Sequence, residues 1–377
     1  MIYICVVMNK VITNAKIYTG EAVLENRNIL VRNGHIVAVI SELPQDIETI
    51  DLAGKNIAPG FIDIQINGGS DKYFSQTPDE ETLEDIYQTC CEYGTPFILP
   101  TLISSPLPLI LQAIDAVRNF REKHPGVLGM HLEGPYFNPA KRGAHHPDIV
   151  RKPTDDELKT IIEHGKDVIK LMTIAPEQFT EAQLDMLLES GITLSAGHTA
   201  MTYDQAQYYF GKGIQLVTHL YNAMTQMGHR ECGVVGAVFD NENVYAPIIL
   251  DGGHCHYAAA RVAYRQKGNK LFLITDSAFL GRSKKQYDWE YGARKMVDGF
   301  YRDSEGNLAG AAISMPEAVK NAKEHLGVTL QHAVEMATSR VAYAVNMQEQ
   351  IGFIKPGYPA YFTVFDDGFN KVASLVL

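Results

Sequence analysis

Cysteine is scarce in this chain, and long apolar runs are absent. Five of the 377 residues are cysteine, an odd number, and no two of them form a Cys-x-x-Cys pair. That pattern is not a disulfide framework and suits a reducing compartment. No stretch approaches the about 20 apolar residues that span a bilayer, and the apolar segment 1–7 lacks the basic flank and cleavage site of a secretory leader. We expect a cytoplasmic protein without a membrane partner, with Met8 as a second candidate start.

Basic charge is also in short supply. The chain has 33 Lys and Arg against 44 Asp and Glu, a net charge of −11, and no run of Lys or Arg exceeds two residues. Proteins that track nucleic-acid phosphates present a basic face, so nucleic acid is excluded as the expected partner. Apolar residues make up 46% of the chain and charged residues 20%, which is typical of a globular protein with a large core.

Eight short runs are nearly continuous in apolar character and alternate with helical patterns. They are Phe61–Asn67, Phe97–Ile103, Val127–Glu133, Val168–Ala175, Ile192–His198, Leu216–Leu220, Val244–Asp251 and Lys270–Asp276. This alternation predicts an α/β fold, a (β/α)8 TIM-like barrel of parallel strands covered by helices. The alternative is an open doubly wound sheet, but that fold calls for a Gly-x-Gly-x-x-Gly turn after its first strand, and none is present there.

Helix starts support this order of elements. Thr154, Thr180 and Thr202 each precede a Glu or Gln by three residues and follow a predicted strand, a spacing typical of capping boxes. The two ends of the chain differ from the middle: short strands and turns fill 9–57 and 353–376, with Asn33-Gly34 as a hairpin signal. We expect a barrel over 58–349 and one small β-sandwich domain built from 1–57 plus 350–377.

Four ionisable residues stand at the ends of predicted strands. Glu133 closes the third run, His198 the fifth, His219 the sixth and Asp276 the eighth. Catalytic groups of barrel enzymes come from these carboxyl-terminal strand ends. One Glu and two His form a ligand set for a catalytic divalent ion, most often zinc. Asp276 is then the carboxylate free to move a proton between water and a leaving group, as a hydrolase requires.

A simpler interpretation has to be weighed for each residue. A single histidine at a strand end is more often a hydrogen-bonded structural residue than a ligand. Four such residues at one rim reverse that preference, because unpaired burial of each would be costly. His131 lies two residues before Glu133, on the same side but deeper, and we expect it to support the ligands or the core.

Longer motifs carry a family resemblance. They are Pro59-Gly-Phe-Ile-Asp63, His131-Leu-Glu-Gly-Pro135, Ser195-Ala-Gly-His198, Thr218-His-Leu-Tyr-Asn-Ala-Met224 and Thr275-Asp276. In this order, from about Met8 to the end of the chain, they resemble the amidohydrolase superfamily and, within it, the deacetylases of N-acetyl amino sugar phosphates. The resemblance implies the barrel with its β domain, and metal-dependent hydrolysis of the acetamide of N-acetylglucosamine 6-phosphate to glucosamine 6-phosphate and acetate.

The resemblance also implies roles for single residues. Glu133, His198 and His219 would hold the metal, Asp276 would transfer the proton, and His145 would polarise the acetyl carbonyl. The residues implied to bind the phosphosugar are Ala144, Asn222, Ala223, Arg230, His254, Ile313, Ser314 and Met315. In relatives the matching arginine comes from the adjacent subunit, which implies a homodimer. Without the family pattern, Arg230 would be interpreted as a charge on the surface and Asn222 as a residue that caps a loop. His256, two residues after His254, is an alternative candidate for binding the sugar phosphate.

The residues of the first predicted strand indicate how many metal ions the site binds. Most amidohydrolases have His-x-His there, whereas this chain has Gln65-Ile-Asn67. Amides are weak ligands, so we expect one tightly bound ion, zinc by default or iron, with Gln65 and Asn67 supporting its ligands. The segments 68–72 and Ser283–Arg302 depart from the family pattern, so the resemblance assigns no lid contacts there.

Two alternative functions stay open. The first is deacetylation of another N-acetyl amino sugar phosphate, such as the galacto epimer, since the loops that read sugar stereochemistry are not placed by the sequence. The second is a catalytically silent barrel that binds sugar phosphates, although no member of the single-metal ligand set is missing here.

Overall fold

The computed structural model describes residues 9–290 and 293–377, so the apolar start at 1–7 and Met8 lie outside the described residues. Five parallel strands form the first part of the barrel, in the order β10-β9-β8-β7-β6, and two more, β11 and β12, pair in parallel beside them. They are β6 (Ile62–Ile66), β7 (Phe97–Ile103), β8 (Met130–Glu133), β9 (Ile169–Ile174), β10 (Thr193–Ala196), β11 (Ala246–Ile249) and β12 (Leu271–Ile274). A parallel bridge between Ile66 and Ser277 joins the two ends of this curled sheet. The predicted α/β barrel is confirmed.

One predicted strand is reduced to isolated contacts. The run Leu216–Leu220 is not a regular strand, and it joins its neighbours through the single bridges Ala196–Val217 and Leu216–Tyr245. His219 has a φ of 29°, outside the extended region, so the extended conformation is interrupted two residues after the bridged Val217. This interruption lies at His219, and the next residue returns to the sheet, where the Leu220 N–H donates to the Pro247 carbonyl of β11.

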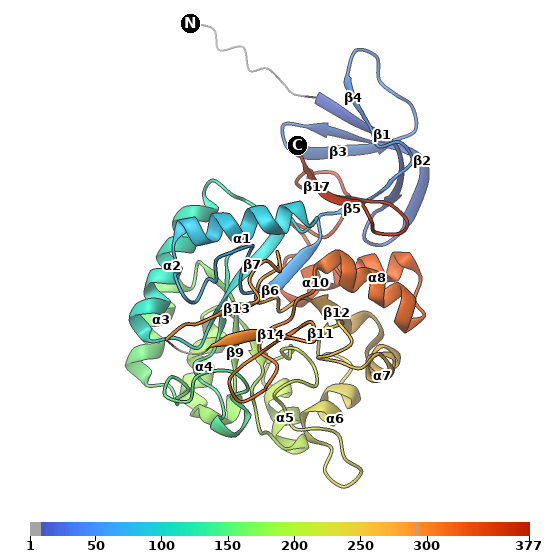
Figure 1. Cartoon of the computed structure of the whole chain (residues 1–377). Coiled ribbons are helices and arrows are strands. Elements are labelled where there is room, and N and C mark those ends of the chain that lie inside the picture. Colours follow the sequence, from blue (N-terminus) through green and yellow to red (C-terminus); the bar gives the residue numbers. More distant parts are fainter. Residues whose placement is uncertain (1–8, 291–292) are drawn as a thin grey trace, which may run out of the picture.

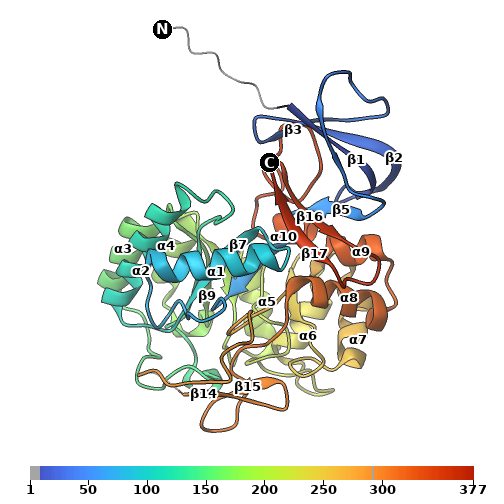
Figure 2. The ribbon, with the colours of Figure 1, turned by 45° about the horizontal axis from the view of Figure 1, so that its top comes forward.

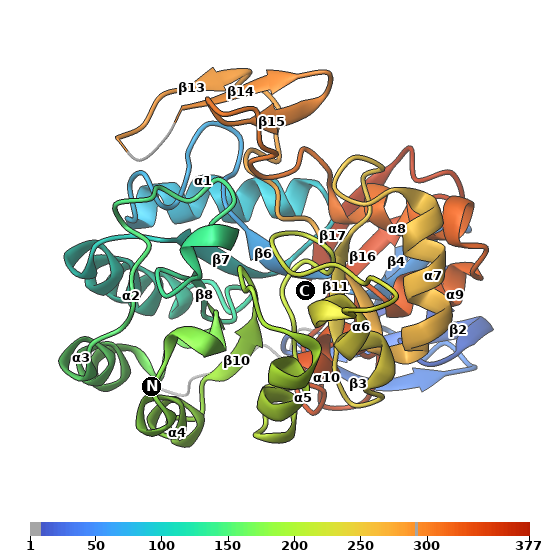
Figure 3. The same cartoon turned by 90° about the horizontal axis from the view of Figure 1, so that it is seen from below.

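Helices surround the strands, as the view along the barrel shows (Figure 3). They are α1 (Glu80–Glu92), α2 (Leu107–Arg121), α3 (Asp155–Gly165), α4 (Glu181–Glu189), α5 (Tyr203–Gly211), α6 (Gly233–Asp240), α7 (Tyr257–Lys267), α8 (Met315–Leu326), α9 (Leu330–Glu335) and α10 (Ser339–Ala344). The boxes predicted at Thr180 and Thr202 form in full, and Thr154 caps its helix through the Glu157 N–H. Of the helices in the described ranges, none combines the length and the apolar character needed to cross a bilayer.

The two ends of the chain share one sheet beside the barrel (Figure 1). Its strands are β1 (Asn9–Tyr18), β2 (Val23–Arg32), β3 (His35–Ile40), β4 (Glu48–Asp51), β5 (Asn56–Pro59), β16 (Tyr361–Phe365) and β17 (Val372–Val376). Their order is β17-β16-β5-β1-β2-β3, with β4 paired to β1, so the sheet is continuous across both ends. Apolar residues from both ends, such as Ile17, Ile57 and Phe362, pack in one cluster. Asn33 and Gly34 both have positive φ, as the predicted hairpin requires.

A third, antiparallel sheet lies on the side of the barrel away from the terminal sheet (Figure 2). It consists of β13 (Gln286–Tyr287), β14 (Arg294–Val297) and β15 (Phe300–Arg302). Tyr287 and Tyr301 pack with Tyr73 and Phe279 in a separate apolar cluster. This sheet lies within Ser283–Arg302, the segment to which the resemblance assigned no contacts, and the aromatic cluster packs it against the barrel.

Candidate active site

Three of the four rim residues stand at or just beyond strand ends, and the fourth, His219, belongs to the irregular run Leu216–Leu220. Glu133 is the last residue of β8, and His198 and Asp276 each stand two residues beyond β10 and β12. His198, His219 and Asp276 all have positive φ, between 29° and 49°. Residues other than glycine avoid this region, and such strain is typical of functional sites. The tight turns direct the three side chains inward over the barrel.

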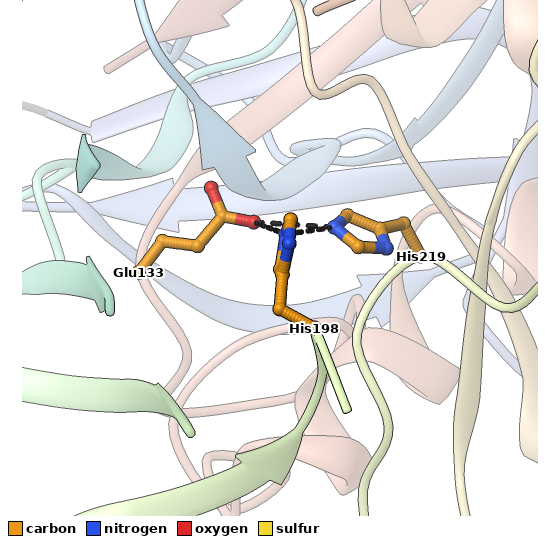
Figure 4. Close-up of side chains that lie close together, drawn as sticks. All are labelled: Glu133, His198 and His219. Carbon is orange, nitrogen blue, oxygen red and sulfur yellow. Dashed lines mark hydrogen bonds and ion pairs between the residues drawn. The ribbon is translucent and has the colours of Figure 1, made fainter. Parts of the chain in front are cut away.

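Glu133, His198 and His219 meet in a compact cluster (Figure 4). His219 Nε2 lies 3.2 Å and His198 Nε2 3.4 Å from Glu133 Oε1, and the two nitrogens are 3.1 Å apart. Ligand atoms around a four-coordinate zinc ion are separated by about 3.3 Å, given bonds of about 2.0–2.1 Å. The spacing of these side chains therefore fits one small divalent cation.

The protonation of His198 suits a ligand. Its Nδ1 lies 3.0 Å from the carbonyl oxygen of Lys141, which can only accept a hydrogen bond. Nδ1 therefore carries the proton, and Nε2 is left with a lone pair directed at the cluster. Burial opposes the charge of Glu133, but its contacts with the imidazoles of His198 and His219 outweigh burial and hold the pKa of this carboxyl well below its usual range.

Two amides stand where most amidohydrolases would have histidines, and both hold carboxylates. Gln65 Nε2 donates to Glu133 Oε1 at 3.0 Å, and Asn67 Nδ2 donates to Asp276 Oδ1 at 2.8 Å. Among the residues that the structure describes, a single cluster of at least three His, Cys, Asp or Glu side chains has its ligand atoms within 4.8 Å of one another. The arrangement is consistent with the expected single ion.

Asp276 and His145 have shifted protonation equilibria. Burial and the nearby charge of Glu133 raise the pKa of Asp276 to about 6. Burial, together with His198, lowers the pKa of His145 well below its usual value, so the ring is neutral. The backbone N–H of Ser104 donates to His145 Nδ1 at 3.3 Å, so the proton of the neutral ring is on Nε2. His145 is thus a hydrogen-bond donor through Nε2.

A cavity of about 270 Å³ opens above these groups. Ten of its lining residues were expected from the sequence: Asn67, Glu133, Ala144, His145, His198, His219, Asn222, Ala223, His254 and Asp276. The others were missed: Tyr73, Ile103, Gly143, Ile249, Arg294, Asn307, Leu308, Ala309 and Gly310. The pocket therefore combines a cluster with the geometry of a metal site, a carboxylate with a raised pKa and a neutral imidazole donor, and these groups are suited to metal-assisted hydrolysis.

Of the two histidines considered for substrate binding, His254 and His256, His254 borders the cavity. Its Nδ1 lies 2.7 Å from Asp251 Oδ2, and its Nε2 is buried without a hydrogen-bond partner beside the cavity. His256 instead caps α7 by accepting from the Ala258 N–H. Of the two, His254 is placed to contact a ligand.

Comparison with known proteins decides the family. Residues 56–376 match the model of the amidohydrolase family, and residues 11–57 match that of the NagA composite domain. The chain belongs to the amidohydrolase family. The resemblance drawn from the motifs is thereby confirmed.

Similar proteins share this architecture over nearly their whole length. The N-acetylglucosamine-6-phosphate deacetylase of Haemophilus influenzae is 36% identical over 98% of both chains. The N-acetylgalactosamine-6-phosphate deacetylase of a Shewanella species is 35% identical over 95% of this chain and 92% of the relative. The crystal structure of N-acetylglucosamine-6-phosphate deacetylase from Pasteurella multocida superposes with a TM-score of 0.94, at 34% identity and 98% coverage of both chains.

Four residues expected to bind substrate lie outside the cavity of this amidohydrolase. Arg230 is exposed on the loop after His219. Ile313 lines a second cavity, Ser314 caps α8 in a capping box with Glu317, and Met315 is buried in the core. The chain touches the cavity five residues earlier, at Leu308, Ala309 and Gly310, because a parallel bridge between Ala311 and Ser277 holds this segment beside Asp276. Gly310 has a φ of 84°, a backbone conformation that favours glycine. The glycine itself was the signal in the sequence that the chain turns here.

His131 has a structural position in the amidohydrolase. It is fully buried, with Nδ1 at 3.3 Å from Thr101 Oγ1 and Nε2 at 2.7 Å from Thr173 Oγ1. Both ring nitrogens are therefore engaged with strands β7 and β9, and the ring supports the floor of the site.

Asp63 on β6 is a buried acid of the barrel. Its carboxyl accepts hydrogen bonds from the Thr275 hydroxyl and from the backbone N–H groups of Gln65 and Thr275. Burial outweighs these bonds and raises the pKa of Asp63 to about 7. The folded protein therefore keeps this acid protonated at pH values where the unfolded chain ionises it.

For this reason we expect the free energy of unfolding to fall as the pH rises from about 4 to about 7. Above pH 7 Asp63 is ionised in both the folded and the unfolded chain, so it causes no further loss. A pKa of about 7 against the ordinary 3.8 corresponds to about 4 kcal/mol of unfolding free energy. Asp63→Asn keeps an acceptor oxygen and cannot ionise, so it should lack this loss. Urea midpoints of both proteins from pH 4.5 to pH 8 measure the difference. Parallel pH profiles of wild type and variant would contradict the prediction.

Proposed function

We propose that this protein hydrolyses the acetamide of N-acetylglucosamine 6-phosphate to glucosamine 6-phosphate and acetate. The observation that carries the proposal is the buried Glu133, His198 and His219 cluster, with Asp276 and a neutral His145 on the same cavity. Relatives at 36% and 34% identity that bear this activity in their names support it.

Glu133, His198 and His219 would hold the divalent ion, which we propose to be zinc, with iron as the second candidate, because two imidazoles and one carboxylate form a catalytic zinc site. An ion bound there supplies a Lewis acid that polarises oxygen and lowers the pKa of water. Gln65 keeps Glu133 oriented through its 3.0 Å hydrogen bond, so the carboxylate does not need to reorganise on binding.

Asp276 moves the proton in the proposed reaction. As a carboxylate it accepts a proton from the attacking water, and as an acid it donates that proton to the departing amine nitrogen. The hydrogen bond from Asn67 fixes one of its oxygens and leaves the other for this transfer. A pKa of about 6 allows both states near neutral pH.

His145 stabilises the negative charge that develops on the acetyl oxygen. Its Nε2–H donor is set by Ser104, whose backbone N–H and hydroxyl both lie at Nδ1. A donor fixed before the reaction costs no reorganisation when the charge appears.

At the other end of the substrate, we propose that Asn222, the Ala223 backbone and His254 contact the sugar phosphate. The segment Leu308–Gly310 lines the same cavity and is placed to contact the sugar.

The galacto epimer is the second candidate substrate. It is favoured by the 35% identity to an N-acetylgalactosamine-6-phosphate deacetylase, nearly equal to that of the gluco enzyme. Values of kcat/KM for the two epimers decide between them.

We further propose that the barrel spans 58–349, that 1–57 plus 350–377 form the small β domain, and that the enzyme is a cytoplasmic homodimer. The free thiols of Cys90, Cys91, Cys232 and Cys255 suit a reducing compartment. Arg230 is exposed away from its own cavity, which leaves it available to a neighbouring subunit.

Acetate release tests the proposal directly. We expect the phosphorylated sugar to be hydrolysed at least about 100-fold more efficiently than N-acetylglucosamine, because the phosphate supplies charge-assisted hydrogen bonds. Metal quantified on the same sample shows whether one ion is bound per chain. Equal efficiency on both sugars would exclude a phosphate site, and a metal-loaded protein that releases no acetate from either would support the silent barrel.

A further inference from the structure

We propose that Arg294, in the β13–β15 sheet, binds the phosphate of the substrate within the same chain. The inference rests on the proposed function, because it takes a phosphosugar as the ligand. Arg294 lies in the segment that departs from the family pattern, so neither the motifs nor the resemblance assigns it a role.

Arg294 is a buried cation without a partner of opposite charge. Its side chain is 3% exposed and borders the active-site cavity. Nε and Nη1 have no hydrogen-bond partner of ordinary geometry, Nη2 lies 3.4 Å from the Ala144 carbonyl oxygen, and the neutral phenols of Tyr73 and Tyr287 lie beside the guanidinium. Asp303, the acidic residue that acts on it electrostatically, forms no ion pair with it and instead accepts hydrogen bonds from the backbone N–H groups of Glu305 and Asn307. Burying a guanidinium in this way is costly unless an anion completes the site.

The cavity needs such a charge. Its walls carry the carboxylates of Glu133 and Asp276 in a protein of net charge −11, and its proposed ligand is an anion. Among the described residues that line it, Arg294 is the only lysine or arginine. Arg142, on the neighbouring loop, is already paired with Glu305 through two contacts of 2.7 and 2.8 Å.

The third sheet brings Arg294 and His254 to the same opening. The β15 residue Phe300 packs against His254, with ring centroids 6.4 Å apart, while Arg294 on β14 contacts Ala144. His254 Nε2 is also buried without a partner. Arg294 Nε and Nη1 and His254 Nε2 are thus three nitrogens without a partner on two side chains that border one cavity, and such donors are suited to the oxygens of one phosphate.

The test compares two sugars and three proteins. Arg294→Met removes the charge and keeps much of the side-chain volume, and Lys295→Met removes the same charge from the adjacent, exposed position of β14. We expect Arg294→Met to lower kcat/KM for N-acetylglucosamine 6-phosphate by about 10- to 100-fold, mainly through KM, as for lost charge-assisted hydrogen bonds. Its kcat/KM for N-acetylglucosamine should stay within about twofold of wild type, and Lys295→Met should leave both sugars unchanged. Inorganic phosphate should inhibit Arg294→Met less than wild type.

Each outcome separates the two proposals. An equal loss on both sugars, or no loss on either, would overturn the role of Arg294 while a wild-type preference for the phosphorylated sugar keeps the proposed function. A wild type without that preference would overturn the proposed function itself. If Arg294→Met does not fold, Arg294→Lys keeps the charge without the fork of donors, and a selective rise in KM for the phosphorylated sugar is then expected.

Discussion

Asp276→Asn is expected to lower kcat by about 100- to 10,000-fold, the range for loss of a general acid and base, while the metal content stays unchanged. Asparagine cannot accept and return a proton, but its oxygen can still accept the hydrogen bond from Asn67. Glu133, His198 and His219 keep their ligand atoms in the variant. Acetate release and metal content, measured on one preparation, give both values.

The pH profile supplies the control for this prediction. The carboxylate form of Asp276 must be present for water attack, so kcat/KM of the wild type should fall as the pH drops through the pKa of this group, about 6 or lower once a cation is bound beside it. The residual activity of Asp276→Asn should lack this acid limb. Turnover of the variant at the wild-type rate would refute the assignment.

Glu133→Gln is expected to abolish stoichiometric metal binding and to lower kcat/KM by at least about 1,000-fold, because it removes the only negative charge of a three-residue ligand set. The charge is held in place by two histidines and Gln65, so no neighbouring carboxylate can replace it without moving. Chelator treatment of the wild type should give the same loss, and added zinc should restore the wild type but not the variant.

Glu189→Gln is the matched control, since Glu189 is exposed at the end of α4, away from the cavity. It should retain metal and activity after the same dialysis. A Glu133→Gln protein that retains one tightly bound ion per chain would contradict the ligand assignment, whatever its activity.

The sequence contained a large part of the candidate site. Glu133, His198, His219 and Asp276 were recognised because each polar residue ends an apolar run, and such ends share one rim in a parallel barrel. The capping boxes at Thr180 and Thr202 were equally local signals, since all their atoms lie within one turn of chain.

Contacts between distant segments were much harder to predict. Asn67 and Asp276 are 209 positions apart, and nothing near either residue shows that an amide holds the carboxylate. Ile313, Ser314 and Met315 were predicted to contact the substrate, but the cavity is lined by Leu308, Ala309 and Gly310, because the bridge between Ala311 and Ser277 sets the register of this segment. Nothing in the sequence near Arg294 indicated that it borders the cavity, because its burial depends on the aromatic cluster beneath the third sheet.

The sequence by itself determined the barrel and predicted the candidate ligand set and the candidate proton-transfer residue, because apolar periodicity and residue chemistry are properties of short stretches of chain. Only the tertiary structure decided which nitrogen of His145 carries the proton, and whether His254 or His256 faces the cavity. It also decided that Arg294 is the one arginine among the described residues that line the cavity. Those outcomes depend on hydrogen bonds and packing between segments that meet only when the chain is folded.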